Sequence, residues 1–232
     1  MVSEPWWQAA FAADYLAVYA HRDDASADAE IAGLMPMLGA GPVLDACCGN
    51  GRHLAALCRR GVAAVGFDWS GDLLRAGREP LRTARADVRS IPFSGGFSAV
   101  LVLFTAFGYF DEVDNLAALH ALAGQLAPGG RLLLDLPDAE RLRAGLVPES
   151  ERLVRTLRVH ERRRLDGPRV LKDVRIIHPD GRERTYTESV HLYTGAEITT
   201  LAAAVGLRVE ACWPGLRGAD LDDGRHAWWL SA

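Results

Sequence analysis

Residues 43–53 constrain the fold of this chain more than any other segment, because an apolar run there ends at an acidic residue and passes directly into a glycine turn. A helix-like pattern begins immediately after the turn. This order of strand, tight loop and helix is how an α/β fold presents backbone N–H groups and a helix N-terminus to a nucleotide-like ligand. Gly49 and Gly51 can adopt positive φ and let a ligand approach the main chain, and Asp45 can accept hydrogen bonds from it.

Acidic residues also follow the next two apolar runs. In nucleotide-binding α/β folds, an acid at the tip of the second strand, about 20 residues after the glycine loop, accepts hydrogen bonds from the ribose hydroxyls, and Asp68 fits that role. Trp69 would then offer its ring to adenine; alternatively, Asp68 or Ser70 caps a helix and Trp69 is a surface aromatic near the start of that helix. Asp87 would accept the adenine amino group, and Val88 would donate its backbone N–H to a ring nitrogen.

An aromatic loop, residues 104–110, follows the fourth apolar run at 97–103. A fourth strand would deliver this loop over a bound nucleotide, so that its rings suggest an apolar or aromatic substrate face. Packing in the core would explain the same rings equally well. The candidates for substrate contact are Thr105, Phe107 and Tyr109.

The glycine loop, the two later acids and the string LAPGGRLLLDLP at 126–137 occur in a fixed order. This set resembles the motifs of class I S-adenosylmethionine-dependent methyltransferases, although Cys47 replaces the first glycine of their acid-x-Gly-x-Gly-x-Gly motif. The string VHLYTGAEITTLAAAVGL is similar to bacterial members that act on small metabolites or peptide-type natural products. The resemblance implies an α/β, Rossmann-like sheet of seven strands with helices on both faces. It also implies S-adenosyl-L-methionine as cofactor and S-adenosyl-L-homocysteine as product. The implied cofactor contacts are Tyr15, Tyr19, Arg22, Asp45, Ala46, Gly49, Gly51, Asp68, Trp69, Asp87, Val88 and Phe104.

The first 40 residues predict two helices, at 6–19 and 26–38, because aromatic and apolar residues recur there with a helical period. In methyltransferases of this shape such helices resemble a lid over the cofactor, and a tyrosine of the lid meets the methionine carboxylate. Tyr15 and Tyr19 match that position, and Arg22 is a charged alternative. Packing against the sheet is an equally good explanation for these side chains.

A small antiparallel insertion is expected over residues 147–193, after the fifth strand. Its pattern reads as three β segments, at 151–165, 170–178 and 184–193, separated by turns containing Gly167 and Gly181. We expect the insertion to cover the substrate; a sheet that mediates dimerisation is the alternative. A capping box at Thr194 starts a helix, and strands at 207–213 and 225–230 close the fold. The segment 216–224 matches no motif and could form a loop on the substrate side.

Methyl transfer from a sulfonium needs little chemical assistance, so placement of the acceptor should do most of the work. The expected reaction is an in-line transfer to an N or O atom of a small metabolite or peptide-type natural product. A neutral amine requires no strong base, whereas a hydroxyl acceptor favours a histidine or carboxylate within hydrogen-bond reach. His191 is the preferred candidate for such a base.

Composition argues against several partners. A net charge of −4 provides no basic field for nucleic acid or an anionic membrane, and the arginines at 152–164 alternate with apolar and acidic residues as on a solvated strand. The four cysteines form neither a disulfide framework nor a metal-ligand pattern, which favours a reducing cytoplasm and no metal. No run suits a membrane span or an export signal. We expect 232 residues to form one domain, monomeric or homodimeric.

Two other classes remain open. A nicotinamide dehydrogenase would use a similar glycine turn, but its third glycine would have to fall at Leu54. A protein that binds S-adenosylmethionine to catalyse a non-methylating rearrangement, or to regulate a partner, would carry the same motifs.

Overall fold

The computed structural model of the chain describes residues 5–11, 14–20, 22–77, 80–217 and 224–232. Seven strands form the central sheet in the order β10-β11-β5-β4-β1-β2-β3. Only β11 runs antiparallel to its neighbours, β5 and β10, among the pairs of this sheet. The strands are β1 (Val43–Ala46), β2 (Ala64–Asp68), β3 (Thr83–Arg85), β4 (Phe97–Val102), β5 (Leu126–Pro137), β10 (Arg208–Trp213) and β11 (Arg225–Ser231). The predicted seven-stranded α/β sheet is therefore confirmed.

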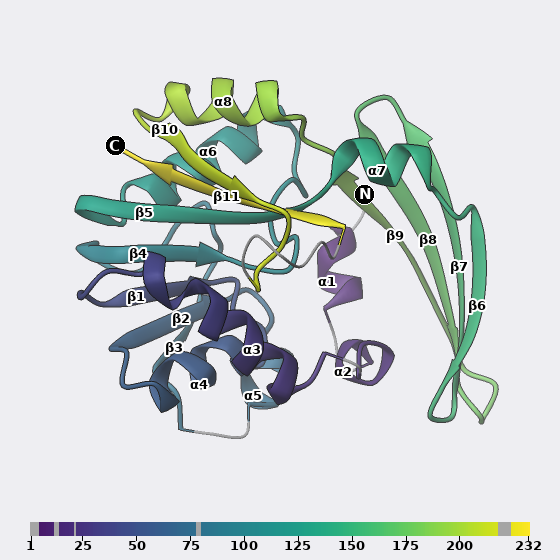
Figure 1. Ribbon diagram of the computed structural model, residues 1–232. Coiled ribbons are helices and arrows are strands. Elements are labelled where there is room, and N and C mark those ends of the chain that lie inside the picture. The colour runs from purple at the N-terminus through teal and green to yellow at the C-terminus, as the bar shows by residue number, and fades with distance from the viewer. Residues whose placement is uncertain (1–4, 12–13, 21, 78–79, 218–223) are drawn as a thin grey trace.

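Helices cover both faces of this sheet (Figure 1). On one face, α3 (Asp24–Leu34) and α4 (Arg52–Arg59) pack with alternate strand residues such as Val43 and Leu101. On the other face, α6 (Glu112–Ala123) and α8 (Gly195–Ala204) pack with the strand residues that point the opposite way, such as Leu44 and Val102. Because side chains of a strand alternate between faces, each central strand is buried on both sides. The short α5 (Gly71–Arg75) follows β2, and the predicted capping box of α8 at Thr194 is present.

A second, four-stranded antiparallel sheet stands beside the first (Figure 1). It consists of β6 (Glu149–Val154), β7 (Leu157–Asp166), β8 (Arg169–Ile177) and β9 (Glu183–His191), in that order. The prediction of three segments was wrong, because the first of them folds into two strands. A tight turn at Arg155, where φ is 56°, separates β6 from β7. No glycine, proline or asparagine marks that turn in the sequence. The sheet also follows a short helix, α7 (Ala139–Ala144), rather than β5 directly.

The N-terminal region differs from the predicted pair of helices. Residues 6–19 form two short helices, α1 (Trp6–Ala10) and α2 (Tyr15–Val18); residues 12 and 13 of the predicted helix lie outside the described residues. Contacts with the second sheet hold this region, since Arg184 donates to the Ala9 carbonyl and Asp14 lies 3.3 Å from Nε2 of His178. The second helix starts at Asp24, after Asp23 as N-cap, and ends in a 3₁₀ turn (Met35–Met37).

Candidate active site

The loop between β1 and α4 has the geometry of a ligand cradle. Gly49 and Gly51 have φ values of 59° and 77°. A Cβ atom added to Gly51 would come within 2.5 Å of Cδ1 of Leu81, the end of a side chain that can move, so the positive φ is the stronger reason for glycine at this position. The loop therefore exposes main chain where a side chain would block it.

Cys47 is also left-handed, with φ of 58°, although it is not a glycine. We expect Cys47→Gly to raise the free energy of unfolding by roughly 0.5–1 kcal/mol, because release of about 1–2 kcal/mol of left-handed strain exceeds the entropic cost of glycine of about 0.5–1 kcal/mol. Urea denaturation would measure this. Cys47→Ala is the matched control, since it removes the thiol but keeps the strain and should not stabilise. Equal effects of both variants would contradict the strain explanation.

Asp68 connects the ends of two elements at the C-terminal edge of the sheet. Its Oδ2 accepts the backbone N–H of Gly49 at 2.8 Å, and its Oδ1 accepts that of Ser70 at 2.7 Å. The residue is 8% exposed, and burial raises the pKa of its carboxyl group. Each carboxylate oxygen retains a further lone pair, so the group can still accept from a ligand hydroxyl.

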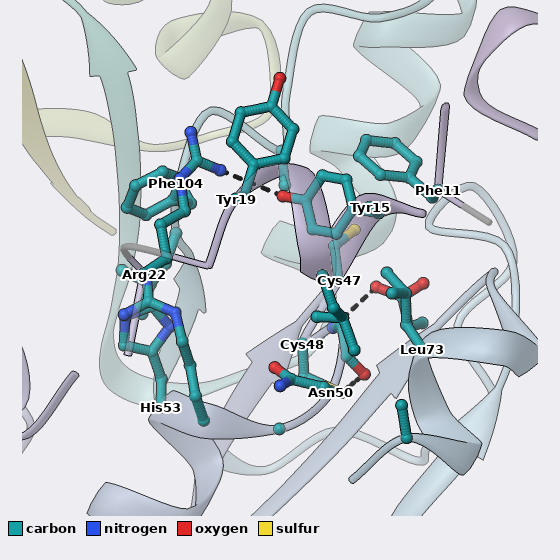
Figure 2. Close-up of a pocket in the computed structure, with 18 of the residues that line it drawn as sticks. Phe11, Tyr15, Tyr19, Arg22, Cys47, Cys48, Asn50, His53, Leu73 and Phe104 are labelled. Carbon is teal, nitrogen blue, oxygen red and sulfur yellow. Dashed lines mark hydrogen bonds between the residues drawn. The ribbon is translucent and has the colours of Figure 1, made fainter. Parts of the chain in front are cut away.

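A cavity of about 510 Å³ lies over this loop. Every predicted cofactor residue except Ala46 lines it, and Ala46 is fully buried in β1. Figure 2 shows Tyr15, Tyr19 and Arg22 on one side of the cavity, facing the glycine loop residues Cys47, Cys48 and Asn50 on the other. Further lining residues were not predicted from the sequence, among them Asn50, Arg52, His53, Leu73 and Leu81. Arg52 and His53 could have been found from their place in the first turn after the glycine loop.

The predicted adenine contacts, Asp87 and Val88, also lie on this cavity. Asp87 accepts hydrogen bonds from the backbone N–H and the Nε of Arg89, at 2.9 and 3.0 Å. The side-chain hydrogen bonds from Arg89 lower the pKa of Asp87, so this acid is an anion engaged by an arginine. Val88 is buried, with 8% of its surface exposed.

Asp45 is a buried acid whose charge state is sensitive to pH. It is 1% exposed, and its Oδ2 has no hydrogen-bond partner among the described residues. Burial raises the pKa of Asp45 to about 7, against the lowering effect of the Arg52 charge. An unpaired acceptor in a cavity is a natural counterpart for a cationic group of a ligand.

The affinity for S-adenosylhomocysteine, whose amino group is cationic, should therefore fall below pH 7. Protonated Asp45 must lose its proton before it can attract a cation, so we expect a loss of up to about tenfold per pH unit. Calorimetric titrations at pH 6, 7 and 8 would measure this, with Asp45→Asn as the variant whose affinity should not follow pH. An equally steep pH profile in Asp45→Asn would assign the effect to another group.

A second cavity, of about 580 Å³, lies against the four-stranded sheet. Its polar lining residues include Ser150, Arg163, Lys172 and Glu188. Lys172 Nζ lies 2.6 Å from Oε2 of Glu188 and donates to the Tyr19 hydroxyl at 2.9 Å. The two cavities share one wall, which consists of Phe11, Tyr15, Tyr19, Arg22, Phe104 and Tyr109.

The predicted substrate residues are divided by the structure. Thr105 and Tyr109 line the second cavity. Phe107 lines neither cavity, because its ring is 3% exposed and packs 5.4 Å from that of Tyr193 in the core. Its assignment as a substrate contact is therefore corrected.

The predicted base, His191, also lies away from both cavities. Its ring stacks on Tyr193 at 4.1 Å, and its Nε2 is 3.2 Å from Oε1 of Glu197. Val190, the preceding residue of β9, lines the second cavity, so that His191 faces the opposite side of the strand. This position does not support a role as general base.

No helix in the part of the chain that the structure describes is long and apolar enough to cross a membrane. Within the same residues, no cluster of histidine, cysteine, aspartate and glutamate could hold a metal ion. Cys47, Cys48 and Cys212 are free thiols.

The chain is similar to known methyltransferases. A family model for a methyltransferase domain matches residues 43–130. The dTDP-3-amino-3,4,6-trideoxy-alpha-D-glucopyranose N,N-dimethyltransferase of Streptomyces venezuelae is 29% identical over 78% of this chain and 81% of that protein. The structure of Streptomyces venezuelae DesVI has a TM-score of 0.68 at 24% identity, over 94% of this chain and 95% of that chain. The CcbJ methyltransferase of Streptomyces caelestis has a TM-score of 0.79 at 16% identity, over 94% and 96%.

The fold is thus that of a class I methyltransferase, as the glycine loop and the sheet order already indicated. These similarities support an S-adenosylmethionine-dependent methyltransferase, with S-adenosyl-L-methionine as its cofactor. The resemblance inferred from the sequence motifs is confirmed.

Proposed function

We propose that the cofactor lies in the cavity over the glycine loop and that the acceptor enters the cavity against the four-stranded sheet. The common wall of the two cavities carries this proposal, because methyl transfer requires donor and acceptor to meet at one boundary. The cofactor fits the residues present. Asp68 would accept from the ribose, the positive φ of Gly49 and Gly51 lets the main chain of the loop face the ligand, and unpaired Asp45 would face a cationic group.

We further propose that the acceptor atom is the nitrogen of an amino group on a small metabolite. The relative from Streptomyces venezuelae is named as an N,N-dimethyltransferase, which supports nitrogen over oxygen. No histidine is among the described residues that line the second cavity. A hydroxyl acceptor would favour such a base, whereas a neutral amine can attack without one.

The residues of the shared wall would perform most of the catalysis. When bound, S-adenosylmethionine supplies an electrophilic methyl group with a neutral thioether as leaving group. Tyr15, Phe11 and Tyr109 form a close aromatic group, with centroids of Phe11 and Tyr15 5.2 Å apart and of Phe11 and Tyr109 5.9 Å apart. These rings exclude water and offer π-faces to a cation, which favours alignment of the reacting groups.

A paired acceptor screen tests the nitrogen proposal. The purified protein is incubated with S-adenosylmethionine carrying a labelled methyl group and with amino sugars, amino-terminal peptides and their hydroxyl analogues. We expect label in amines, accompanied by equimolar S-adenosylhomocysteine. Label only in the hydroxyl analogues would refute the choice of nitrogen. Cofactor binding without any S-adenosylhomocysteine across the screen would favour a regulatory or non-methylating role.

We propose that residues 1–40 act as a lid and residues 147–193 as a cover within a single domain. The described residues of both regions line the two cavities, and the bond from Lys172 to Tyr19 joins them. We also propose that the enzyme acts in the cytoplasm, as a cysteine pattern without a disulfide framework favours, and binds no nucleic acid, as its net charge of −4 favours. A monomer or homodimer is expected, and light scattering would distinguish them.

A further inference from the structure

The loop after β4 contains two consecutive residues in a conformation that favours glycine. Phe104 and Thr105 have φ values of 64° and 60°, and neither is a glycine. Such a pair persists only where the surrounding structure holds it, and backbone outliers of this kind cluster at functional sites. Phe104 belongs to the wall shared by the two cavities, so its placement bears directly on methyl transfer.

Asp135 holds this turn from the end of the neighbouring strand β5. Its Oδ2 accepts the N–H of Phe104 at 2.6 Å, and its carbonyl oxygen accepts that of Thr105 at 3.0 Å. Asp135 is fully buried and is paired with Arg225 of β11, whose Nε donates to Oδ1 at 2.9 Å. A second contact joins the Arg225 guanidinium to Oδ2. The carboxylate is therefore locked between the turn and the arginine.

The ring of Phe104 is in turn surrounded by guanidinium groups. The Cζ atoms of Arg22, Arg225 and Arg52 lie 3.5, 4.1 and 4.9 Å from its centroid. Figure 2 shows Arg22 alongside Phe104, where it also donates to the Tyr15 hydroxyl at 3.1 Å. The Nε of Arg22 and the Nη2 of Arg52 are buried without a hydrogen-bond partner among the described residues.

The charges around the ring do not balance. Arg52 is bonded to Glu30 at 3.1 Å, and Arg225 is paired with Asp135, so that each has a carboxylate partner. Arg22 has a tyrosine hydroxyl instead. The cluster thus holds surplus positive charge and unused N–H donors at the boundary of the cofactor cavity, which is suited to an anionic group of a ligand.

We infer that Asp135 and Arg225 are positioning residues, which fix the left-handed turn and thereby hold Phe104 and its arginines against the amino-acid end of the cofactor. Neither residue lines the cofactor cavity, so both act through Phe104. This inference rests on the cofactor placement proposed above. Loss of an ion pair with a purely structural role would weaken the binding of every part of the ligand alike. Loss of this pair should weaken only the contacts with the amino-acid end, because the pair holds the turn that carries Phe104.

Binding of two ligands distinguishes a positioning role from a general loss of structure in the variants. S-adenosylhomocysteine carries the amino-acid end, whereas 5′-methylthioadenosine has the same adenosine without it. For Asp135→Asn and Arg225→Met, we expect calorimetry to show at least a tenfold loss of affinity for S-adenosylhomocysteine and a change below threefold for 5′-methylthioadenosine. Phe104→Leu keeps the ion pair but removes the ring, and it should show the same selective loss.

A second substitution tests the backbone mechanism. Glycine adopts positive φ without support, so Thr105→Gly added to Asp135→Asn should recover at least threefold of the lost affinity for S-adenosylhomocysteine. Glu210→Gln is the matched control, because Glu210 pairs at 2.8 Å with Arg131, at the opposite end of the pairing between β5 and β11; it should change neither affinity.

Three results would overturn the inference. The first is an equal loss of both ligands in Asp135→Asn and Arg225→Met, which would indicate a structural role alone. The second is unchanged affinity for S-adenosylhomocysteine in these variants. The third is a wild-type protein that binds neither ligand, which would overturn the cofactor placement together with the inference.

Discussion

Asp68→Ala should weaken the binding of S-adenosylmethionine by about fivefold to more than a hundredfold, the range that a loss of about 1–3 kcal/mol produces. The Asp68 carboxylate accepts the N–H groups of Gly49 and Ser70, so its removal leaves two backbone donors without this acceptor at the cavity. It also removes the proposed acceptor for the ribose hydroxyls. Both losses should lower the affinity for the ligand, because the ligand approaches the surface formed by the glycine loop.

Calorimetry on Asp68→Ala would measure the effect, and Asp72→Ala is its control. Asp72 is an exposed acid in α5, paired with Arg75 and absent from the lining of the cavity over the glycine loop. Its replacement should leave the affinity unchanged. Asp68→Asn keeps the volume but exchanges one acceptor oxygen for a donor, and it should fall between the two. An affinity of Asp68→Ala within threefold of the wild type would refute the ribose assignment.

Asp45 and Asp68 could be predicted from the sequence because their positions depend on local pattern. Each ends an apolar run, and parallel strands bring their C-terminal ends to one edge of a sheet. The register confirms this, since Ala46 pairs with Phe67 in β1 and β2. Neighbouring parallel strands thus bring the glycine loop and Asp68 into hydrogen-bond contact, although 19 residues separate Gly49 from Asp68.

The orientation of the aromatic loop could not be predicted in the same way. In an extended strand, Thr105, Phe107 and Tyr109 would share a face. The loop is not extended, because Thr105 and Gly108 have φ values of 60° and 91°. Thr105 and Tyr109 therefore reach the second cavity while Phe107 enters the core. Side chains of β9 do alternate between the two faces of the strand. Because Val190 lines the second cavity, the next residue, His191, faces away from it and is not placed to act as a base there.

Long-range charge pairs were beyond the reach of sequence patterns. Arg225 pairs with Asp135 across 90 residues, and Glu30 pairs with His53 across 23. Such partners meet only because the strand order places β11 beside β5 and packs α3 against α4. No motif or periodicity indicates which of the 26 basic residues will be buried with an acid.

Glu30→Ala should have the largest effect on stability, lowering the free energy of unfolding by about 3–5 kcal/mol, as expected when one partner of a buried ion pair is removed. Glu30 is 7% exposed and lies between Nη1 of Arg52, at 3.1 Å, and Nε2 of His53, at 2.7 Å. Without it, the Arg52 charge stays buried with no carboxylate. Urea denaturation at pH 7.5 would measure the change. Glu210→Ala removes a partner that is about a third exposed and should cost less than about 1 kcal/mol.

The difference between wild type and Glu30→Ala should also depend on pH, with a definite sign. Burial by itself raises the pKa of Glu30, but the hydrogen bond from His53 and the nearby charges lower it to about 2, from an ordinary value of 4.5. An acid whose pKa is lower in the folded state stabilises the fold fully at pH values above its ordinary pKa. That contribution is lost as the pH falls toward the pKa of the folded state. The stability difference should therefore be constant from pH 7 to 5 and shrink between pH 4.5 and 2. Burial also lowers the pKa of His53 to about 4, so both proteins should weaken from pH 6.5 downward, which makes the comparison between them necessary. A difference that stayed constant down to pH 3 would show that the Glu30 charge contributes nothing.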